Sequence, residues 1–278
     1  MSKKIQKNYA VMIIILASVA IIMSVAMSVV LYFDHDAYTG LTSGVMHTVI
    51  MALIAPVFGG VGAVCACLLK SKALVEYDKE GKMNVFSSVS CVVVAVVGVV
   101  LSMSYLMGSY ADPLKNLLNQ PGATPYYSNL LSVVLAFCVS IVMAFMAFGK
   151  NGPYSPVRQL PILGFAICYG VRLHTDMSNI LMNTRRMLSV LAVCMLLLFI
   201  TAKIRVLCDK SAQNYYVISG FLAVGALSVS GLSGVMLNVL GAANDGIQLW
   251  FYAYELSLAV YVFFELFKYS YEGKKVNK

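Results

Sequence analysis

The side chains that could bind a ligand or move a proton are few in this sequence, and they lie among long apolar runs. The stretch YGVRLHTDMSNILMNTRRM, residues 169–187, contains three arginines, one histidine and one aspartate. Arg172 and Asp176 are four residues apart, so on a helix they share one face and can pair. Glu255 lies inside another apolar run, where an ionisable residue is a candidate functional group because its burial is unfavourable. Glu255 is the strongest single candidate.

Other polar residues are expected at a similar depth. His47 lies a little under two turns into its apolar run, and Glu255 lies roughly 12 Å along the axis of its own run. We expect the candidate residues to include the only strongly polar side chains away from the membrane surfaces. The candidate ligand-binding residues are Arg172, Asp176, His174, His47, Glu255 and Asn238.

The arginines also have an interfacial interpretation. Counting about 1.5 Å per residue from Arg158, Arg172 lies roughly 21 Å along its helix, which is inside an apolar slab. Alternatively, Arg172 extends its side chain to the outer headgroups. We expect Arg185 and Arg186, at the start of the next run, to contact lipid headgroups.

Composition predicts that these residues lie in a membrane. Of 278 residues, 60% are hydrophobic and 12% are charged, against about 25% charged in soluble domains. The mean hydropathy is +0.82, and the apolar residues come in long blocks rather than alternating faces. The net charge of +8 does not indicate nucleic-acid binding, because the cations lie in short runs between apolar blocks.

Runs of about 20 apolar residues predict helices that cross a bilayer. Seven runs are clear, and one that starts near Arg158 is doubtful because its apolar core, LPILGFAICYGV, is only 12 residues long. We predict an all-α polytopic integral membrane protein, a bundle of eight transmembrane helices. It forms a single domain, 1–278, with no soluble domain. The spans lie near residues 9–33, 41–69, 84–108, 128–149, 158–176, 186–207, 214–241 and 247–268.

Charge asymmetry predicts the orientation. With eight spans and a cytoplasmic N-terminus, the 20 Lys and Arg residues all fall on the cytoplasmic side except Lys115, Arg172, Arg185 and Arg186. This bias satisfies the positive-inside rule, and it predicts that both termini are cytoplasmic and that the membrane is the cell membrane. Without the doubtful span, the lysine-rich C-terminus would lie on the wrong side. A re-entrant segment at 158–176 is the alternative.

Small residues predict close helix packing in two spans, one of which contains the run PVFGGVGAVCAC, residues 56–67. The other contains SGFLAVGALSVSGLSGVM, residues 219–236. Ala226, Ser230 and Gly234 recur every fourth residue and form a smooth helical stripe. Packing within the bundle is the expected use of this stripe, and a dimer face or flexible gate is the alternative. Pro56, followed by Gly59 and Gly60, is the best candidate for a break in a span.

The sequence does not predict disulfides, a metal site, a cofactor or a catalytic motif. The seven cysteines lie in apolar runs or at a cytoplasmic edge, so we expect no disulfide. No metal site and no cofactor are expected. The sequence lacks HExxH and serine-elbow motifs, so we do not expect an enzyme.

Two functions stay open. In the first, the protein binds or transports a small polar or zwitterionic solute in the outer half of the bundle, with Arg172 taking an acidic group and Glu255 a basic one. In the alternative, it is an accessory or scaffold/sensor subunit of a membrane complex. The expected partners are membrane lipids, a small polar solute, and a second copy or another membrane protein, but no nucleic acid.

Overall fold

The structure, a computed structural model, describes residues 3–33, 45–68, 85–109, 124–148, 156–175, 184–208, 212–241 and 249–271. Within these ranges the chain is helical and contains no strand, which confirms the all-α class. The helices are α1 (Lys3–Phe33), α2 (Met46–Ile54), η1 (Ala55–Gly59), α3 (Gly60–Leu68), α5 (Val85–Ser109), α7 (Thr124–Phe148), η2 (Val157–Gln159), α8 (Leu160–Thr175), α9 (Thr184–Leu207), α10 (Gln213–Val239) and α11 (Leu249–Tyr271).

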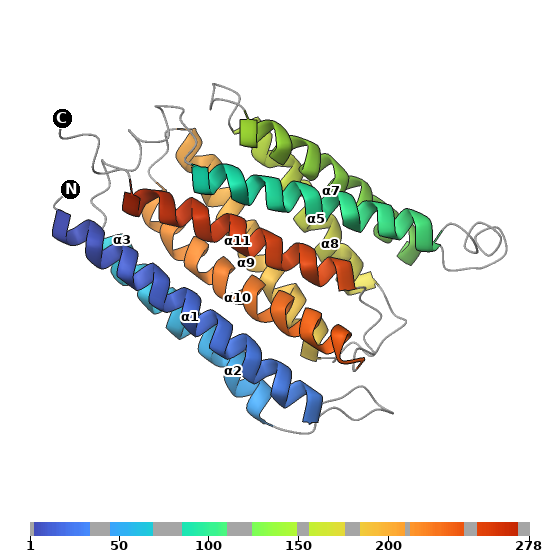
Figure 1. Ribbon diagram of the computed structural model, residues 1–278, viewed down its shortest axis with the longest axis horizontal. Helices are drawn as coiled ribbons and strands as arrows, with labels where there is room; N and C mark the ends of the chain where they lie inside the picture. Colours follow the sequence, from blue (N-terminus) through green and yellow to red (C-terminus); the bar gives the residue numbers. More distant parts are fainter. Residues whose placement is uncertain are drawn as a thin grey trace.

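Six of the helices pack in a closed order, which we call the ring (Figure 1). In this order α10 packs against α11, α11 against α5, α5 against α7, α7 against α8, α8 against α9, and α9 against α10. The pair formed by α1 and the segment α2–η1–α3 packs on one flank of the ring, against α10. The start of α1 and the end of α11 lie at the same end of the bundle, as expected when the chain runs along the bundle an even number of times.

Helix α10 is the most deeply buried of the long apolar helices because small residues let its neighbours approach closely. A Cβ on Gly231 would lie 2.7 Å from the backbone N of Leu256 and 2.9 Å from the carbonyl oxygen of Tyr252. The backbones of α10 and α11 therefore touch at this point. The predicted stripe of small residues is buried within the same bundle: Ala226, Ser230 and Gly234.

The segment between residues 46 and 68 is a helix interrupted by a π-helical turn. This turn, η1, lies where Pro56, Gly59 and Gly60 predict a break, and Pro56 removes a backbone donor near its start. Phe58 of η1 is fully buried, and its ring lies 2.5 Å from the place where a Cβ on Gly225 would be. The turn can therefore dock on α10 only because residue 225 has no side chain.

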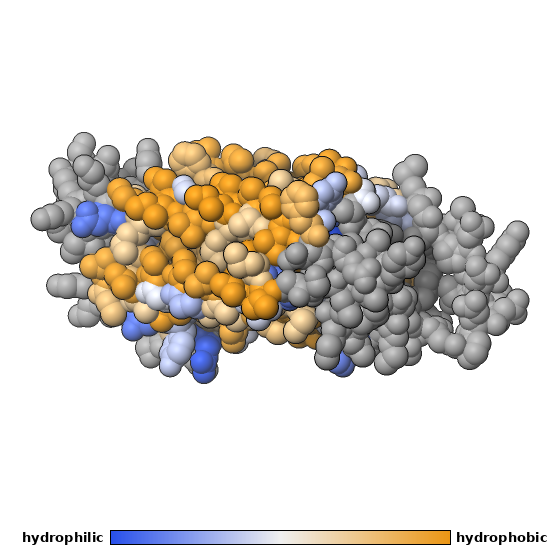
Figure 2. Space-filling view, turned by 90° about the horizontal axis from the view of Figure 1, so that it is seen from below, coloured by the Kyte–Doolittle hydropathy of each residue, from blue (hydrophilic) through white to orange (hydrophobic). Residues whose placement is uncertain are grey.

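Among the residues that the structure describes, seven helices are long and apolar enough to cross a membrane, judged by length and composition. They coincide with the seven clear runs in the sequence and differ from them by a few residues at the ends. Large apolar side chains such as Ile22, Phe145 and Phe148 are exposed, and Figure 2 shows a face on which hydrophobic residues cover most of the described surface. Such a surface is compatible with a multi-pass membrane protein.

The doubtful run forms α8, a continuous helix of 16 residues that follows the short turn η2. At its start, the Gln159 amide donates to the sulfur of Met146 at the end of α7. At its other end, the Leu173 carbonyl accepts a hydrogen bond from Nε of Arg186 at the start of α9. Helix α8 is therefore about 24 Å long and extends from near the end of α7 to near the start of α9.

All seven cysteines are free. Cys65 and Cys91 are buried, and the other five are at least partly exposed.

Candidate functional site

Glu255 lies at the centre of a buried polar group that draws on four helices of the ring. Only 1% of its surface is exposed. The Tyr169 hydroxyl on α8 donates to Glu255 Oε1 at 2.7 Å, and the Ser230 hydroxyl on α10 donates to Oε2 at 2.6 Å. The hydroxyls of Ser230 and of Ser189 on α9 lie 3.0 Å apart. Both carboxylate oxygens of Glu255 are thus held by hydroxyl donors, which lowers the penalty for burying the charge.

Arg172 belongs to the same group. Its side chain is 4% exposed, and its Cζ lies 3.8 Å from the centroid of the Phe251 ring and 5.8 Å from that of Tyr169. At these distances the guanidinium is attracted by the negative faces of the rings. Phe251 precedes Glu255 by one helical turn. Arg172 and Glu255 therefore share Tyr169 as a neighbour. We call these three residues, together with Ser189, Ser230 and Phe251, the Glu255 cluster.

Aromatic rings surround this cluster. Tyr169 stacks on Phe251 with centroids 5.2 Å apart and on Phe165 with centroids 5.5 Å apart. Phe165 meets Tyr254 edge-on at 4.9 Å. All four rings are buried. Because they exclude water, electrostatic interactions among the charged groups of the cluster are stronger than at a surface.

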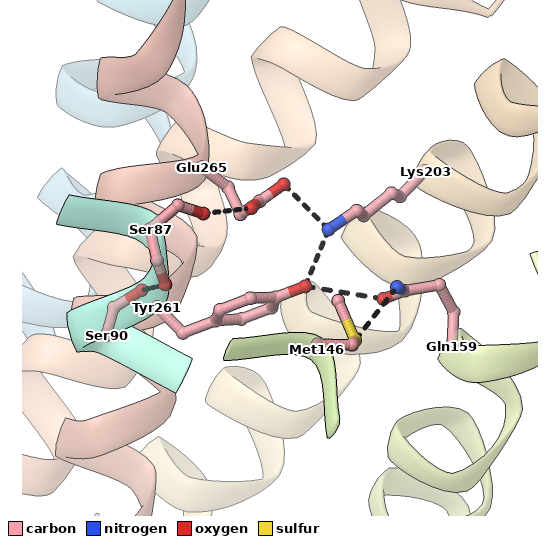
Figure 3. Close-up of polar contacts among 7 residues, drawn as sticks. All are labelled: Ser87, Ser90, Met146, Gln159, Lys203, Tyr261 and Glu265. Atoms are coloured by element: carbon pink, nitrogen blue, oxygen red, sulfur yellow. Dashed lines mark hydrogen bonds and ion pairs between the residues drawn. The ribbon is translucent and has the colours of Figure 1, made fainter. Parts of the chain in front are cut away.

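A second buried polar group lies one and a half turns before the end of α11. Nζ of Lys203 on α9 donates to Glu265 Oε2 at 2.7 Å and to the Tyr261 hydroxyl at 2.6 Å (Figure 3). The Ser87 hydroxyl on α5 donates to Glu265 Oε1 at 2.7 Å. The Tyr261 hydroxyl in turn donates to Oε1 of Gln159 at 3.4 Å. We call these five residues the Glu265 cluster.

The Glu265 cluster corrects one expectation from the sequence. Glu255 and its companions were expected to be the only strongly polar side chains away from the surfaces, but Lys203, Glu265 and Gln159 are also buried. Lys203 was counted among the cytoplasmic cations, whereas its ammonium group lies inside the ring. The sequence did carry a signal: Phe251 and Glu255 are four residues apart on α11, and so are Tyr261 and Glu265.

Three further predicted residues, His174, His47 and Asn238, do not join the Glu255 cluster. His174 is exposed on α8, and His47 is partly buried on α2, at the flank of the ring, with Nε2 3.1 Å from the Thr48 hydroxyl. The Asn238 amide donates to the Gly234 carbonyl of its own helix at 2.9 Å. Asp176, and with it the predicted pairing to Arg172, lies outside the described residues.

Arg185 and Arg186 lie in the first turn of α9, and both side chains are buried. Arg186 is held by the Leu173 carbonyl at the end of α8. Their contact with lipid headgroups stays a prediction.

The chemistry available at the two clusters is binding and proton exchange. Each offers one carboxylate, one basic side chain and hydroxyl donors, all buried. In the part of the chain that the structure describes, no group of three His, Cys, Asp or Glu residues could hold a metal ion.

The fold and the clusters together define a class: an apolar, all-helical bundle with charged groups buried in its core. Comparison with protein-family models, curated protein sequences and solved structures finds no match to this chain.

Proposed function

We propose that this chain is a multi-pass protein of the cell membrane that binds and transports a small polar solute, and that the Glu255 cluster is its binding site. The observation that carries the proposal is the burial of Glu255 and Arg172 around one shared neighbour, Tyr169. Charges inside an apolar bundle are costly, so they are expected where they contact a ligand or an ion path. The two groups come from opposite members of the ring, α11 and α8, so a solute between them would contact both.

The proposed solute carries both an acidic and a basic group. The Arg172 guanidinium would bind the acidic group through its planar set of donors, and the Glu255 carboxylate would bind the ammonium group. In this structure the hydroxyls of Tyr169 and Ser230 already donate hydrogen bonds to the Glu255 carboxylate, at 2.7 and 2.6 Å. The solute's ammonium group would replace one of these donors, and aromatic rings would enclose its apolar part.

The proposed topology has eight crossings with both termini in the cytoplasm. Support comes from the seven long apolar helices, from the course of α8 between the ends of α7 and α9, and from the shared end of α1 and α11. The charge bias of the sequence assigns that shared end to the cytoplasm. The Glu265 cluster then lies in the cytoplasmic half of the bundle, and the Glu255 cluster in the outer half.

The experiment is a ligand screen on the full chain in mild detergent, read as thermal stabilisation. The probes are zwitterionic amino acids, dicarboxylates and primary amines. We expect a zwitterion to stabilise the protein, and Glu255→Gln and Arg172→Gln to abolish the shift. Arg205→Gln is the matched control, because it makes the same change as Arg172→Gln at an exposed arginine of α9 that belongs to neither cluster.

Two results would contradict the proposal. One is stabilisation that survives both Glu255→Gln and Arg172→Gln. The other is a reproducible partner protein at fixed stoichiometry in native mass spectrometry, together with no response to any probe, which would favour an accessory subunit.

A further inference from the structure

We propose that the Glu265 cluster is a gate, closed in this structure, that separates the Glu255 cluster from the cytoplasm. This inference rests on the proposed function, because a transporter must open the two ends of its path in turn. The gate consists of the ion pair between Lys203 and Glu265 and of the Ser87 and Tyr261 hydroxyls that hold it.

The position of the cluster fits this role. Lys203 and Glu265 reach toward each other from α9 and α11, Ser87 comes from α5, and Gln159 comes from η2 at the start of α8 (Figure 3). Four parts of the ring are thus tied together at one level. The charged pair is buried, with relative side-chain exposures of 5% for Lys203 and 3% for Glu265. A solute could not pass this level unless these contacts separated.

An apolar layer separates the two clusters. Glu255 and Glu265 are ten residues apart on α11, or about 15 Å along the helix. Between the positions of Glu255 and Tyr261, α11 buries Leu258 and Ala259. Ser257 is also buried there, and its hydroxyl donates to the Tyr254 carbonyl of the same helix. Between Ser189 and Lys203, α9 buries Leu196 and Phe199. The described state therefore has a dry layer beneath the Glu255 cluster and an ion pair beyond that layer.

An ion pair suits a gate better than it suits a permanent clamp. Apolar side chains of similar size often hold buried helices together as well as an ion pair, because they carry no desolvation penalty. A pair of charges has two favourable states. When dry, the groups bind each other, and when water enters, each regains its hydration. A hydrated open state is therefore available to the cytoplasmic end.

A native cysteine reports on the opening. Cys91 follows Ser87 by one turn of α5 and is fully buried. In a variant in which the other six cysteines are replaced by alanine or serine, its reaction with a membrane-impermeant, water-soluble thiol reagent measures water access beside the gate. Sealed vesicles of each orientation show from which side the reagent enters.

Two serines on α5 form a matched pair of variants. Ser87→Ala removes the hydrogen bond to Glu265, whereas Ser90→Ala removes only a 2.8 Å bond to the backbone carbonyl of Ser87. We expect Ser90→Ala to label like the parent, Ser87→Ala to label several-fold faster, and Lys203→Met to label roughly 100-fold faster, from the cytoplasmic side only.

The proposal is overturned if Lys203→Met, folded by gel filtration, labels at the parental rate, or if labelling accelerates equally from both sides. If Lys203→Met does not fold, equal rates for Ser87→Ala and Ser90→Ala overturn it. Solute binding is measured on the same samples. Unchanged labelling refutes the gate whether or not a solute binds, and the absence of solute binding refutes the proposed function whatever the labelling shows.

Discussion

The contact between α10 and α11 gives the sharpest prediction. In Gly231→Ala, the new Cβ would lie 2.7 Å from the Leu256 backbone N, where ordinary contacts begin at 3.4 Å. The clashing atoms belong to backbone, so the helices must separate by about 0.7 Å, the difference between these distances. Overpacking costs about 1–3 kcal/mol, and we expect the upper part of this range, about 2–3 kcal/mol, because backbone atoms cannot rotate away from the clash. The better helix propensity of alanine returns up to ~1 kcal/mol. We expect a net loss of about 1–2 kcal/mol, or roughly 2–8 °C in Tm.

The matched control for this variant is Gly170→Ala on α8. There the new Cβ would meet Val193 Cγ1 at 3.4 Å, an ordinary contact, so the propensity gain comes without overpacking. We expect its Tm to equal or exceed that of the parent. Both are measured by thermal unfolding in mild detergent with a thiol-reactive dye, in a background in which the five partly or fully exposed cysteines are replaced by alanine or serine. In that background only Cys65 and Cys91 remain, and both are buried until the bundle opens. The reasoning is refuted if Gly231→Ala melts within about 1 °C of the parent, which corresponds to a loss of only about 0.3 kcal/mol. It is also refuted if Gly170→Ala lowers Tm as much as Gly231→Ala does.

Two further predictions concern single buried groups. Lys203→Met should destabilise the protein by about 3–5 kcal/mol because it leaves the Glu265 carboxylate buried without its cation. Adding Glu265→Leu should recover most of this loss. A double variant that is no more stable than Lys203→Met in the same melting assay would contradict this prediction. Phe58→Ala should cost about 3–5 kcal/mol because the ring is fully buried against α10, and a loss below ~1 kcal/mol would show that the π-helical turn does not depend on this contact.

The helices and the burial of Glu255 could be predicted because both depend on local sequence. Run length decides whether a helix can form and cross a bilayer, and a charge inside such a run must be buried against protein or water. Which face each residue takes could be predicted only in part. Arg172 and His174 are two residues apart, so they point to nearly opposite sides of α8, and the burial of Arg172 leaves His174 exposed. The sequence analysis grouped Arg172 and His174 in one candidate site only because we expected them at a similar depth in the membrane.

The Glu265 cluster could not be predicted because its partners are far apart in the chain. Lys203 and Glu265 are separated by 62 residues, and the ion pair depends on how α9 faces α11. Lys203 lies in the last two turns of its helix, where a lysine usually extends to the headgroups. The positive-inside rule counts such a lysine correctly for orientation but does not distinguish an exposed ammonium group from a buried one.

Helix α11 connects the two clusters mechanically. At each level it carries an aromatic residue and a glutamate four positions later, Phe251 with Glu255 and Tyr261 with Glu265. At each level a cation from another helix of the ring lies over the aromatic ring. Ten residues turn a helix by about 280° beyond two full turns, so the glutamates face directions roughly 80° apart. Glu255 therefore faces α8 and α10, while Glu265 faces α9 and α5. Since one rigid helix carries both, a tilt of α11 that parts Glu265 from Lys203 must also shift Glu255 against Tyr169 and Ser230. The two ends of the proposed path would then change together.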